Sequence, residues 1–158
     1  MRRTLKRFLL RTGLYGPVWE LRGRLRGLDP RTLLANRRYL ARHPPDHPLP
    51  PPRLIYEVVN HYRIDAFLAG GRERADAIVS ALESTGFSPG TCRRALDFGC
   101  GCGRVIRPLA DRIPAEWHGS DLNPRLVAWC RDNLSFATFT TNELAPPLPF
   151  EDSFFDLI

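Results

Sequence analysis

The sequence lacks several features that mark large classes of protein. It contains no apolar run approaching the ~20 residues that a membrane-spanning helix needs. The apolar run Phe8-Leu9-Leu10 is also too short for the hydrophobic part of a signal peptide. No internal repeat is visible beyond an alternation of strand-like and helix-like segments. We therefore expect no membrane span. A cytoplasmic location is expected on other grounds, because nothing in the sequence suggests a disulfide framework.

Cysteine is scarce and poorly spaced for metal binding. The four cysteines form no Cys-x-x-Cys pair, and no histidine stands at ligand spacing to Cys100 or Cys102. His43 and His47 could share a helix face, but the prolines between and after them forbid that helix. We predict no metal site and no disulfide framework, with Cys100 and Cys102 serving as small residues in a turn.

Lysine is almost absent, since Lys6 is the only one among 23 basic residues. The formal net charge is +6 and is unevenly distributed. Residues 1–63 hold 14 Lys and Arg against 4 Asp and Glu, whereas residues 64–158 hold 9 against 13. Arginine pairs bidentately with phosphate and carboxylate, so the basic part could contact an anionic partner. The alternative is a genome whose base composition favours arginine codons.

The basic part is predicted to be a helical extension over residues 1–43. Apolar residues at helical spacing indicate a basic amphipathic helix over 1–12, a second helix from Pro17, and a third that Asp29 caps and that runs to about Arg42. The first helix is compatible with peripheral membrane or nucleic-acid contact. The simpler interpretation, which we favour, is a docked helix with a solvated basic face.

Six prolines in residues 43–52 predict an extended linker over 44–52, followed by a larger unit over 53–158. Within that unit we expect helices over 53–69 and 72–86, separated by Gly70-Gly71, and further helices from Val105 and from Asn123. Strands are expected at 93–98, 116–121, 136–141 and 154–158. This alternation predicts an α/β fold, a Rossmann-like doubly wound parallel sheet of about four strands, incomplete at Ile158.

The most informative stretch is Leu96 to Arg104, where three glycines on alternate positions follow an apolar strand and precede a helix. Such a turn lets a ligand approach the backbone closely. The dinucleotide pattern Gly-x-Gly-x-x-Gly would require glycine at 104, which is arginine. Arg104 is expected to pair with an acid such as Asp97. Asp97 could also be a purely structural carboxylate that contacts no ligand.

These motifs resemble those of class I S-adenosylmethionine-dependent methyltransferases, over residues 53–158. The resemblance implies cofactor contacts from the turn, from the acid at the end of the second strand and from two residues near the adenine: Asp97, Gly99, Cys100, Gly101, Gly103, Asp121, Leu122 and Asn142. In this resemblance Asp121 takes the ribose hydroxyls, Leu122 lies against the adenine and Asn142 meets its amino group. Arg72 is a candidate for the cofactor's carboxylate. The segment from Leu148 to Ile158 resembles the family's approach to its fourth strand.

The resemblance implies an enzyme that transfers a methyl group from S-adenosyl-L-methionine to an acceptor, for which we favour a small molecule over RNA. The sequence identifies no catalytic base. Because Ile158 falls within the expected fourth strand, we expect these residues to be the N-terminal part of a longer methyltransferase domain, inactive alone. Two alternatives remain open: an NAD(P)-binding oxidoreductase, and a nucleic-acid-binding module acting through residues 1–43. Asp121 could also act only as a cap of the helix that begins near Asn123.

Overall fold

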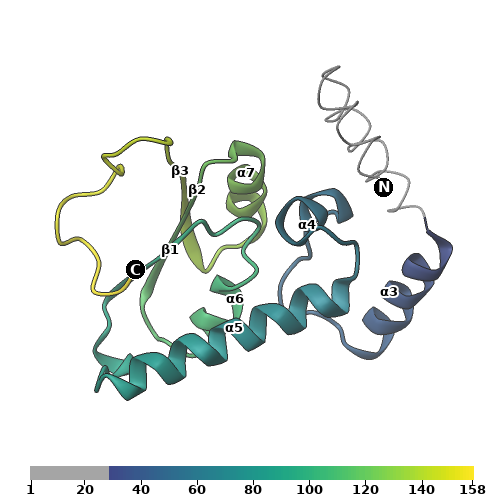
Figure 1. The fold of residues 1–158 in the computed structure, drawn as a ribbon, viewed down its shortest axis with the longest axis horizontal. Helices are drawn as coiled ribbons and strands as arrows, with labels where there is room; N and C mark the ends of the chain where they lie inside the picture. Colours follow the sequence, from purple (N-terminus) through teal and green to yellow (C-terminus); the bar gives the residue numbers. More distant parts are fainter. Residues whose placement is uncertain (1–28) are drawn as a thin grey trace, which may run out of the picture.

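The computed structural model describes residues 29–158, so the helices expected at 1–12 and from Pro17 lie outside the described residues. Its centre is a parallel sheet of β1 (Arg94–Phe98), β2 (Glu116–Asp121) and β3 (Ala137–Thr141), in the order β1-β2-β3 (Figure 1). The register pairs Ala95 with Trp117 and Trp117 with Ala137. These strands agree with the predicted ones to within one residue at each end.

The expected fourth strand is represented by a single parallel bridge. Leu157 pairs with Ala95, and its carbonyl oxygen accepts a hydrogen bond of 2.9 Å from the Leu96 N–H. The Asp156 carboxylate accepts from the N–H groups of Arg93 and Arg94 at 2.8 and 2.9 Å. This last segment therefore lies on the free side of β1, and the strand positions run Leu157, β1, β2, β3. The Rossmann-like arrangement is confirmed.

The two faces of the sheet are covered differently, because side chains alternate along each strand. On one face, Trp117 and Phe139 pack with α6 (Ile106–Ala110) and α7 (Pro124–Asn133) in the main core. On the other face, the His118 ring lies 5.2 Å from the Phe155 ring, one of three phenylalanines from the last loop that surround it. The helices and the last loop thus enclose the central strand from opposite sides.

In the described part of the chain, three helices precede the sheet. They are α3 (Pro30–Arg42), α4 (Pro52–Val59) and α5 (Ile64–Ser84), and a short 3₁₀ turn, Pro89–Thr91, leads into β1. The Asp29 carboxylate caps α3 by accepting from the Arg31 and Thr32 N–H groups, as predicted. No helix among the described residues is long and apolar enough to cross a membrane.

The prediction of one helix over 53–69 followed by a break at Gly70-Gly71 was wrong. The break comes earlier, where Asn60 adopts a left-handed conformation with φ of 57° and ends α4. Gly70 and Gly71 lie inside α5, and Gly71 is needed there for packing. A Cβ at Gly71 would lie 2.4 Å from the carbonyl oxygen of Arg104, so only glycine lets α5 approach that backbone.

The proline-rich segment after α3 packs against the body of the molecule. Leu49 joins a second core cluster with Ile55 and Phe67, to which Tyr39 and Leu40 of α3 also belong. The His47 ring lies 4.8 Å from the Phe136 ring, just before β3. Residues 43–51 therefore form a strap across the helices, without regular secondary structure.

Candidate active site

Three strand ends meet at one edge of the sheet, because β1, β2 and β3 are parallel. β1 is followed by the glycine turn, residues 99–103, β2 ends at Asp121, and β3 is followed by Asn142. The Asn142 N–H donates to the Asp121 carbonyl oxygen at 3.2 Å. The structure thus brings together residues that the sequence separates by more than 40 positions.

The glycine turn is fixed to the end of β2. The N–H groups of Gly99 and Cys100 both donate to the Ser120 carbonyl oxygen, at 2.8 and 2.9 Å. Gly99, Gly101 and Gly103 all have positive φ, of 77°, 57° and 75°. At Gly99 nothing lies within 4 Å of where a Cβ would be, so that side of the turn is open to a ligand.

Asp121 is held by backbone groups on both sides. One carboxylate oxygen accepts from the Gly101 N–H at 2.9 Å, and the other accepts from the Asn123 N–H at 2.8 Å. A carboxylate has about four acceptor sites, so two remain for a ligand. The N-cap of α7 is Asn123, whose side chain accepts from the Arg125 N–H at 3.1 Å. Asp121 orients the residue that caps α7 and does not itself cap the helix.

Asp97 is a buried acid on β1. Burial raises the pKa of its carboxyl group to about 6, against the lowering effect of the Ile106 N–H. One of its oxygens is buried without a hydrogen-bond partner among the described residues. No ion pair joins it to Arg104, so that predicted pairing was wrong: the Arg104 side chain extends toward α5, where its Nη1 would lie 3.2 Å from a Cβ at Gly70.

Leu122, which follows Asp121, is exposed, whereas Asn142 on the neighbouring strand end is buried. The Leu122 side chain is 49% exposed, which makes it available to an apolar ligand surface. Asn142 is buried, and its amide nitrogen donates to the Glu143 carbonyl oxygen at 2.9 Å. Its side-chain oxygen is buried and has no partner among the described residues, so it remains free to accept a hydrogen bond.

The cysteines of the turn belong to the core. Cys100 is 4% exposed, and a hydrogen bond with Cys130 together with burial raises the pKa of its thiol far above the ordinary value. Burial raises the pKa of Cys102 to about 12. Both thiols stay protonated at neutral pH and are poor nucleophiles. Among residues 29–158, no group of His, Cys, Asp or Glu is placed to hold a metal ion.

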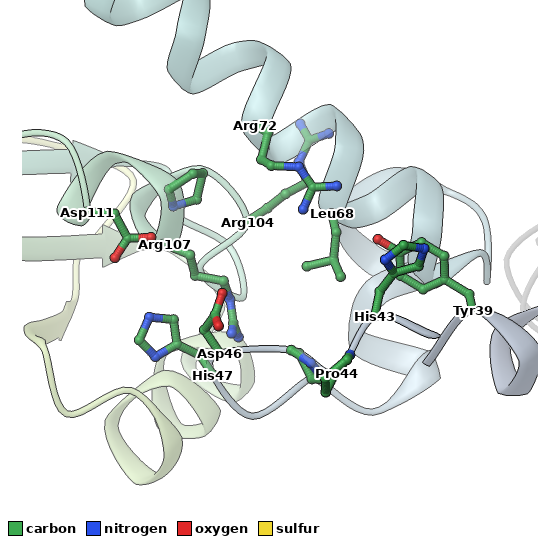
Figure 2. Close-up of a pocket in the computed structure, with 12 residues that line it drawn as sticks. Tyr39, His43, Pro44, Asp46, His47, Leu68, Arg72, Arg104, Arg107 and Asp111 are labelled. Atoms are coloured by element: carbon green, nitrogen blue, oxygen red, sulfur yellow. The ribbon is translucent and has the colours of Figure 1, made fainter. Parts of the chain in front are cut away.

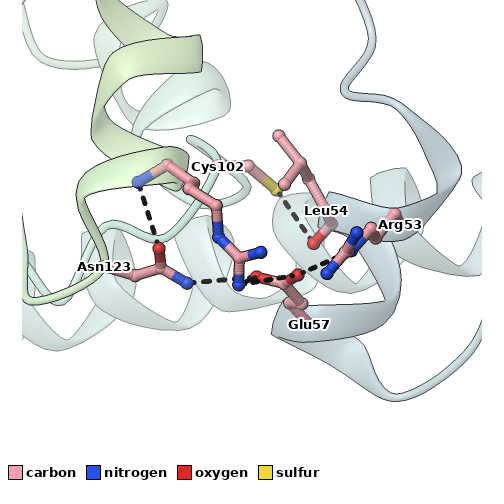
Figure 3. A network of polar contacts seen from close by, with 6 residues as sticks. Arg53, Leu54, Glu57, Cys102 and Asn123 are labelled. Carbon is pink, nitrogen blue, oxygen red and sulfur yellow. Dashed lines mark hydrogen bonds and ion pairs between the residues drawn. The ribbon is translucent and has the colours of Figure 1, made fainter. Parts of the chain in front are cut away.

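Sequence reasoning missed the role of α4, which closes over the turn (Figure 3). Glu57 accepts a hydrogen bond from the Asn123 side chain at 3.0 Å and forms an ion pair of 3.4 Å with Arg125. Val58 lies against Gly101, where a Cβ would be 3.0 Å from its methyl group. These contacts join positions up to 68 residues apart, and a single sequence carries no periodic pattern that predicts them.

Arg72 lies in a different place from the glycine turn. It lines a cavity between α5, α6 and the strap, together with Arg104 and Arg107 (Figure 2). None of the eight residues predicted to contact the cofactor lines this cavity.

Comparison with known proteins supports a methyltransferase fold. Residues 95–158 match the model of a family described as "Methyltransferase domain". A search of curated proteins gives no match.

Three solved structures illustrate the likeness. CalS10, an amino pentose methyltransferase from Micromonospora echinaspora, is 25% identical over 60% of this chain and 37% of its own, with a TM-score of 0.44. A TehB-like methyltransferase from Corynebacterium glutamicum is 21% identical over 48% and 46%, with a TM-score of 0.31. The plantazolicin methyltransferase BpumL is 15% identical over 85% and 43%, with a TM-score of 0.38. The chain spans less than half the length of each.

The family match covers β1, the glycine turn, Asp121 and the segment beside β1. The carboxyl ends of the strands, with the glycine turn, Asp121, Leu122 and Asn142, are called the open edge of the sheet below. The expectation from the motifs is confirmed for this part of the chain. Residues 95–158 are therefore similar to a methyltransferase domain, as the motifs suggest.

Proposed function

We propose that this chain supplies the cofactor-binding half of an S-adenosylmethionine-dependent methyltransferase. The observation that carries the proposal is the junction of glycine turn and acid, in which the Gly101 N–H donates to the Asp121 carboxylate at 2.9 Å. The Asp121 carboxylate oxygens, which only accept hydrogen bonds, therefore lie beside the glycine turn. The turn has open space next to Gly99, which any side chain larger than that of glycine would partly fill. A vicinal diol and a flexible chain extending from it suit this pair of features.

The residues of the open edge fit the parts of S-adenosylmethionine. The two free acceptor sites of Asp121 would take the ribose hydroxyls, and Leu122 would lie against the adenine. The unpartnered side-chain oxygen of Asn142 would accept from the adenine amino group. The glycine turn, including Cys100 and Gly103, would hold the methionine portion, and the unpartnered oxygen of Asp97 would face its ammonium group.

The cofactor itself supplies the activated methyl group, because a sulfonium is a good leaving group. The work of the protein is then to hold donor and acceptor in line and to exclude water. We propose a small molecule as the acceptor. Tyr39, an aromatic side chain of the basic extension that could have stacked on an RNA base, packs instead against the second core cluster.

Neither alternative gains a supporting observation. An NAD(P) site would favour a third glycine at 104, where the structure has an arginine whose side chain extends toward α5. None of the three solved structures compared above is described as an oxidoreductase or a nucleic-acid-binding protein.

The test is calorimetric binding of S-adenosylhomocysteine by the protein and by Asp121→Asn. A hydrogen bond to a charged group contributes about 1.5–3 kcal/mol, so the substitution should weaken binding roughly 10- to 100-fold. For the 2′-deoxy analogue the same substitution should cause a smaller loss of affinity, because only one of the two hydroxyl contacts remains to be weakened. Asp132→Asn, an exposed acid on α7, is the matched control. Unchanged affinity in Asp121→Asn, or tighter binding of NAD than of S-adenosylhomocysteine, would contradict the proposal.

A further inference from the structure

A cavity of about 140 Å³ is lined by residues of α5, α6 and the strap (Figure 2). This is roughly ten times the minimum space that one water molecule needs, so it can hold an ion of several heavy atoms. Three arginines line it: Arg72 from α5, Arg104 from the turn before α6, and Arg107 from α6.

Arg107 is the central observation. Its residue is 5% exposed, and its Nε and one Nη are buried without a hydrogen-bond partner among the described residues. Its guanidinium carbon lies 5.4 Å from the centre of the Trp129 ring, a cation–π contact that provides neither a negative charge nor a hydrogen-bond acceptor for the two nitrogens. Burial lowers the pKa of Arg107, as expected for a charge taken out of water. A buried charge without a counter-ion is strongly unfavourable, so this site favours an anion.

Arg104 also lacks hydrogen-bond partners and a counter-ion among the described residues. Its Nε is also buried without a partner, and burial followed by the positive charge of Arg74 lowers its pKa. Across residues 29–158, neither Arg104 nor Arg72 forms an ion pair. Other arginines of the chain do find acids: Arg112 pairs with Asp76, and Arg125 with Glu57.

Two aspartates also line the cavity, and they do not neutralise these arginines. Asp46 lies on the strap and Asp111 follows α6, yet neither comes within ion-pair distance of an arginine among the described residues. His43 and His47 line the same cavity from the strap and bring no negative charge. Within residues 29–158, no carboxylate therefore pairs with the guanidinium groups that line the cavity.

We propose that this cavity is a second ligand site that binds a phosphate group, separate from the cofactor site. Guanidinium groups bind phosphate bidentately, and three of them converge on a space that fits such an ion. The phosphate is either free in solution or part of a small phosphate ester. In an ester, the organic part would lie toward the Tyr39 ring, which belongs to α3 and lines the same cavity.

The experiment is a calorimetric titration of the protein with inorganic phosphate and with phenyl phosphate, at constant ionic strength set by chloride. We expect saturable binding with one site per chain. Arg72→Gln, an exposed position on α5, should weaken phosphate binding at least tenfold without disturbing the fold. Arg107→Lys keeps the charge but loses the fork, and should also weaken it. Arg93→Gln removes an exposed arginine outside the cavity and should leave binding unchanged.

The outcomes separate this proposal from the cofactor site. Equal affinity for both probes points to free phosphate, and tighter binding of phenyl phosphate points to an ester. Absence of saturable binding, or equal binding in Arg72→Gln and the parent, overturns the proposal. Displacement of phosphate by S-adenosylhomocysteine also overturns it, because the arginines would then belong to the cofactor site. Binding of S-adenosylhomocysteine that phosphate leaves unaffected supports both sites independently.

Discussion

At the scale of single residues, Asp97 shows a conflict between stability and binding. A carboxyl group whose pKa is raised to about 6 by burial must ionise at neutral pH inside a site that disfavours its charge. Such groups are typical of functional sites, because a cationic ligand group can supply the missing partner. Asp97 is thus the residue of the open edge with the clearest energetic cost.

Replacing Asp97 with Asn should stabilise the protein at neutral pH. The folded-state pKa of about 6 lies above the unfolded value near 3.9, so the folded state binds more protons between these pH values and its stability falls as pH rises through this window. We expect Asp97→Asn to raise the free energy of unfolding by about 1–3 kcal/mol at pH 7.5. The gain should vanish near pH 4, where both forms are neutral. Urea denaturation at the two pH values measures this.

Asp97→Asn should also weaken S-adenosylhomocysteine binding. Weaker binding in a more stable variant would show that the buried charge of Asp97 serves the ligand, and that its cost to stability does not come from poor packing. Asp132→Asn again serves as the control and should change neither quantity. A stabilisation that is equal at both pH values would contradict the electrostatic explanation.

At the scale of elements, α5 is defined by one close approach. The helix continues through Gly70 and Gly71 because its partner there is the backbone of Arg104. Glycine inside a helix costs about 0.5–1 kcal/mol relative to alanine, so its presence at 71 needs a packing reason, and the contact supplies one. This contact also links α5 to the end of the glycine turn.

The two adjacent glycines make a matched pair for testing that contact. Gly71→Ala would place its Cβ 2.4 Å from a carbonyl oxygen, which cannot move without shifting the turn. We expect a loss of about 1–3 kcal/mol in the free energy of unfolding. At Gly70 the nearest atom is the flexible end of Arg104, at 3.2 Å, so Gly70→Ala should be close to neutral or slightly stabilising. Equal effects in urea denaturation would show that helix propensity, not packing, decides both.

A second element contact joins α3 to the start of α5. The buried side chain of Asn36 donates to the Tyr62 carbonyl oxygen at 2.7 Å and accepts from the Ile64 N–H at 3.0 Å. Asn36 thus satisfies a free N–H at the beginning of α5, a role that a residue next to the helix normally takes. The contact spans 28 positions of the sequence.

At the scale of the whole molecule, α3 and the strap share a core with the rest of the chain. Tyr39, Leu40 and Leu49 pack with Ile55 and Phe67 in the second core cluster. The expected linker over 44–52 therefore contributes packing as well as length. Removing these residues would expose apolar side chains of α4 and α5 to water.

A chain beginning at Pro52 should accordingly unfold at a lower temperature than a chain beginning at Asp29. Across domains of 60–250 residues, each kcal/mol lost lowers Tm by about 2–8 °C, and the missing contacts should cost at least about 1 kcal/mol. Thermal unfolding followed by circular dichroism compares the two. An equal Tm for both chains would mean that α3 and the strap are not needed for stability.

The sequence by itself determined the strands, the glycine turn and the acid at the end of β2. These features are local, because strand periodicity, the turn requirement for glycine and helix capping by Asp29 and Asn123 all act over a few residues. It also predicted the resemblance to methyltransferases, since that resemblance rests on motifs in order along the chain. The eight cofactor contacts remain predictions, although the structure brings the glycine turn, Asp121 and Asn142 to one edge of the sheet.

The tertiary structure alone decided where the helices break and what the arginines face. Gly70-Gly71 looks like a break in sequence, and only the approach of the Arg104 backbone explains why a helix passes through it. The closure of α4 over the turn depends on contacts between distant segments, and so does the burial of two Arg107 nitrogens that have no hydrogen-bond partner in the described part of the chain. Burial and the distance to a counter-ion are set by packing in three dimensions, and no local pattern in the sequence records them.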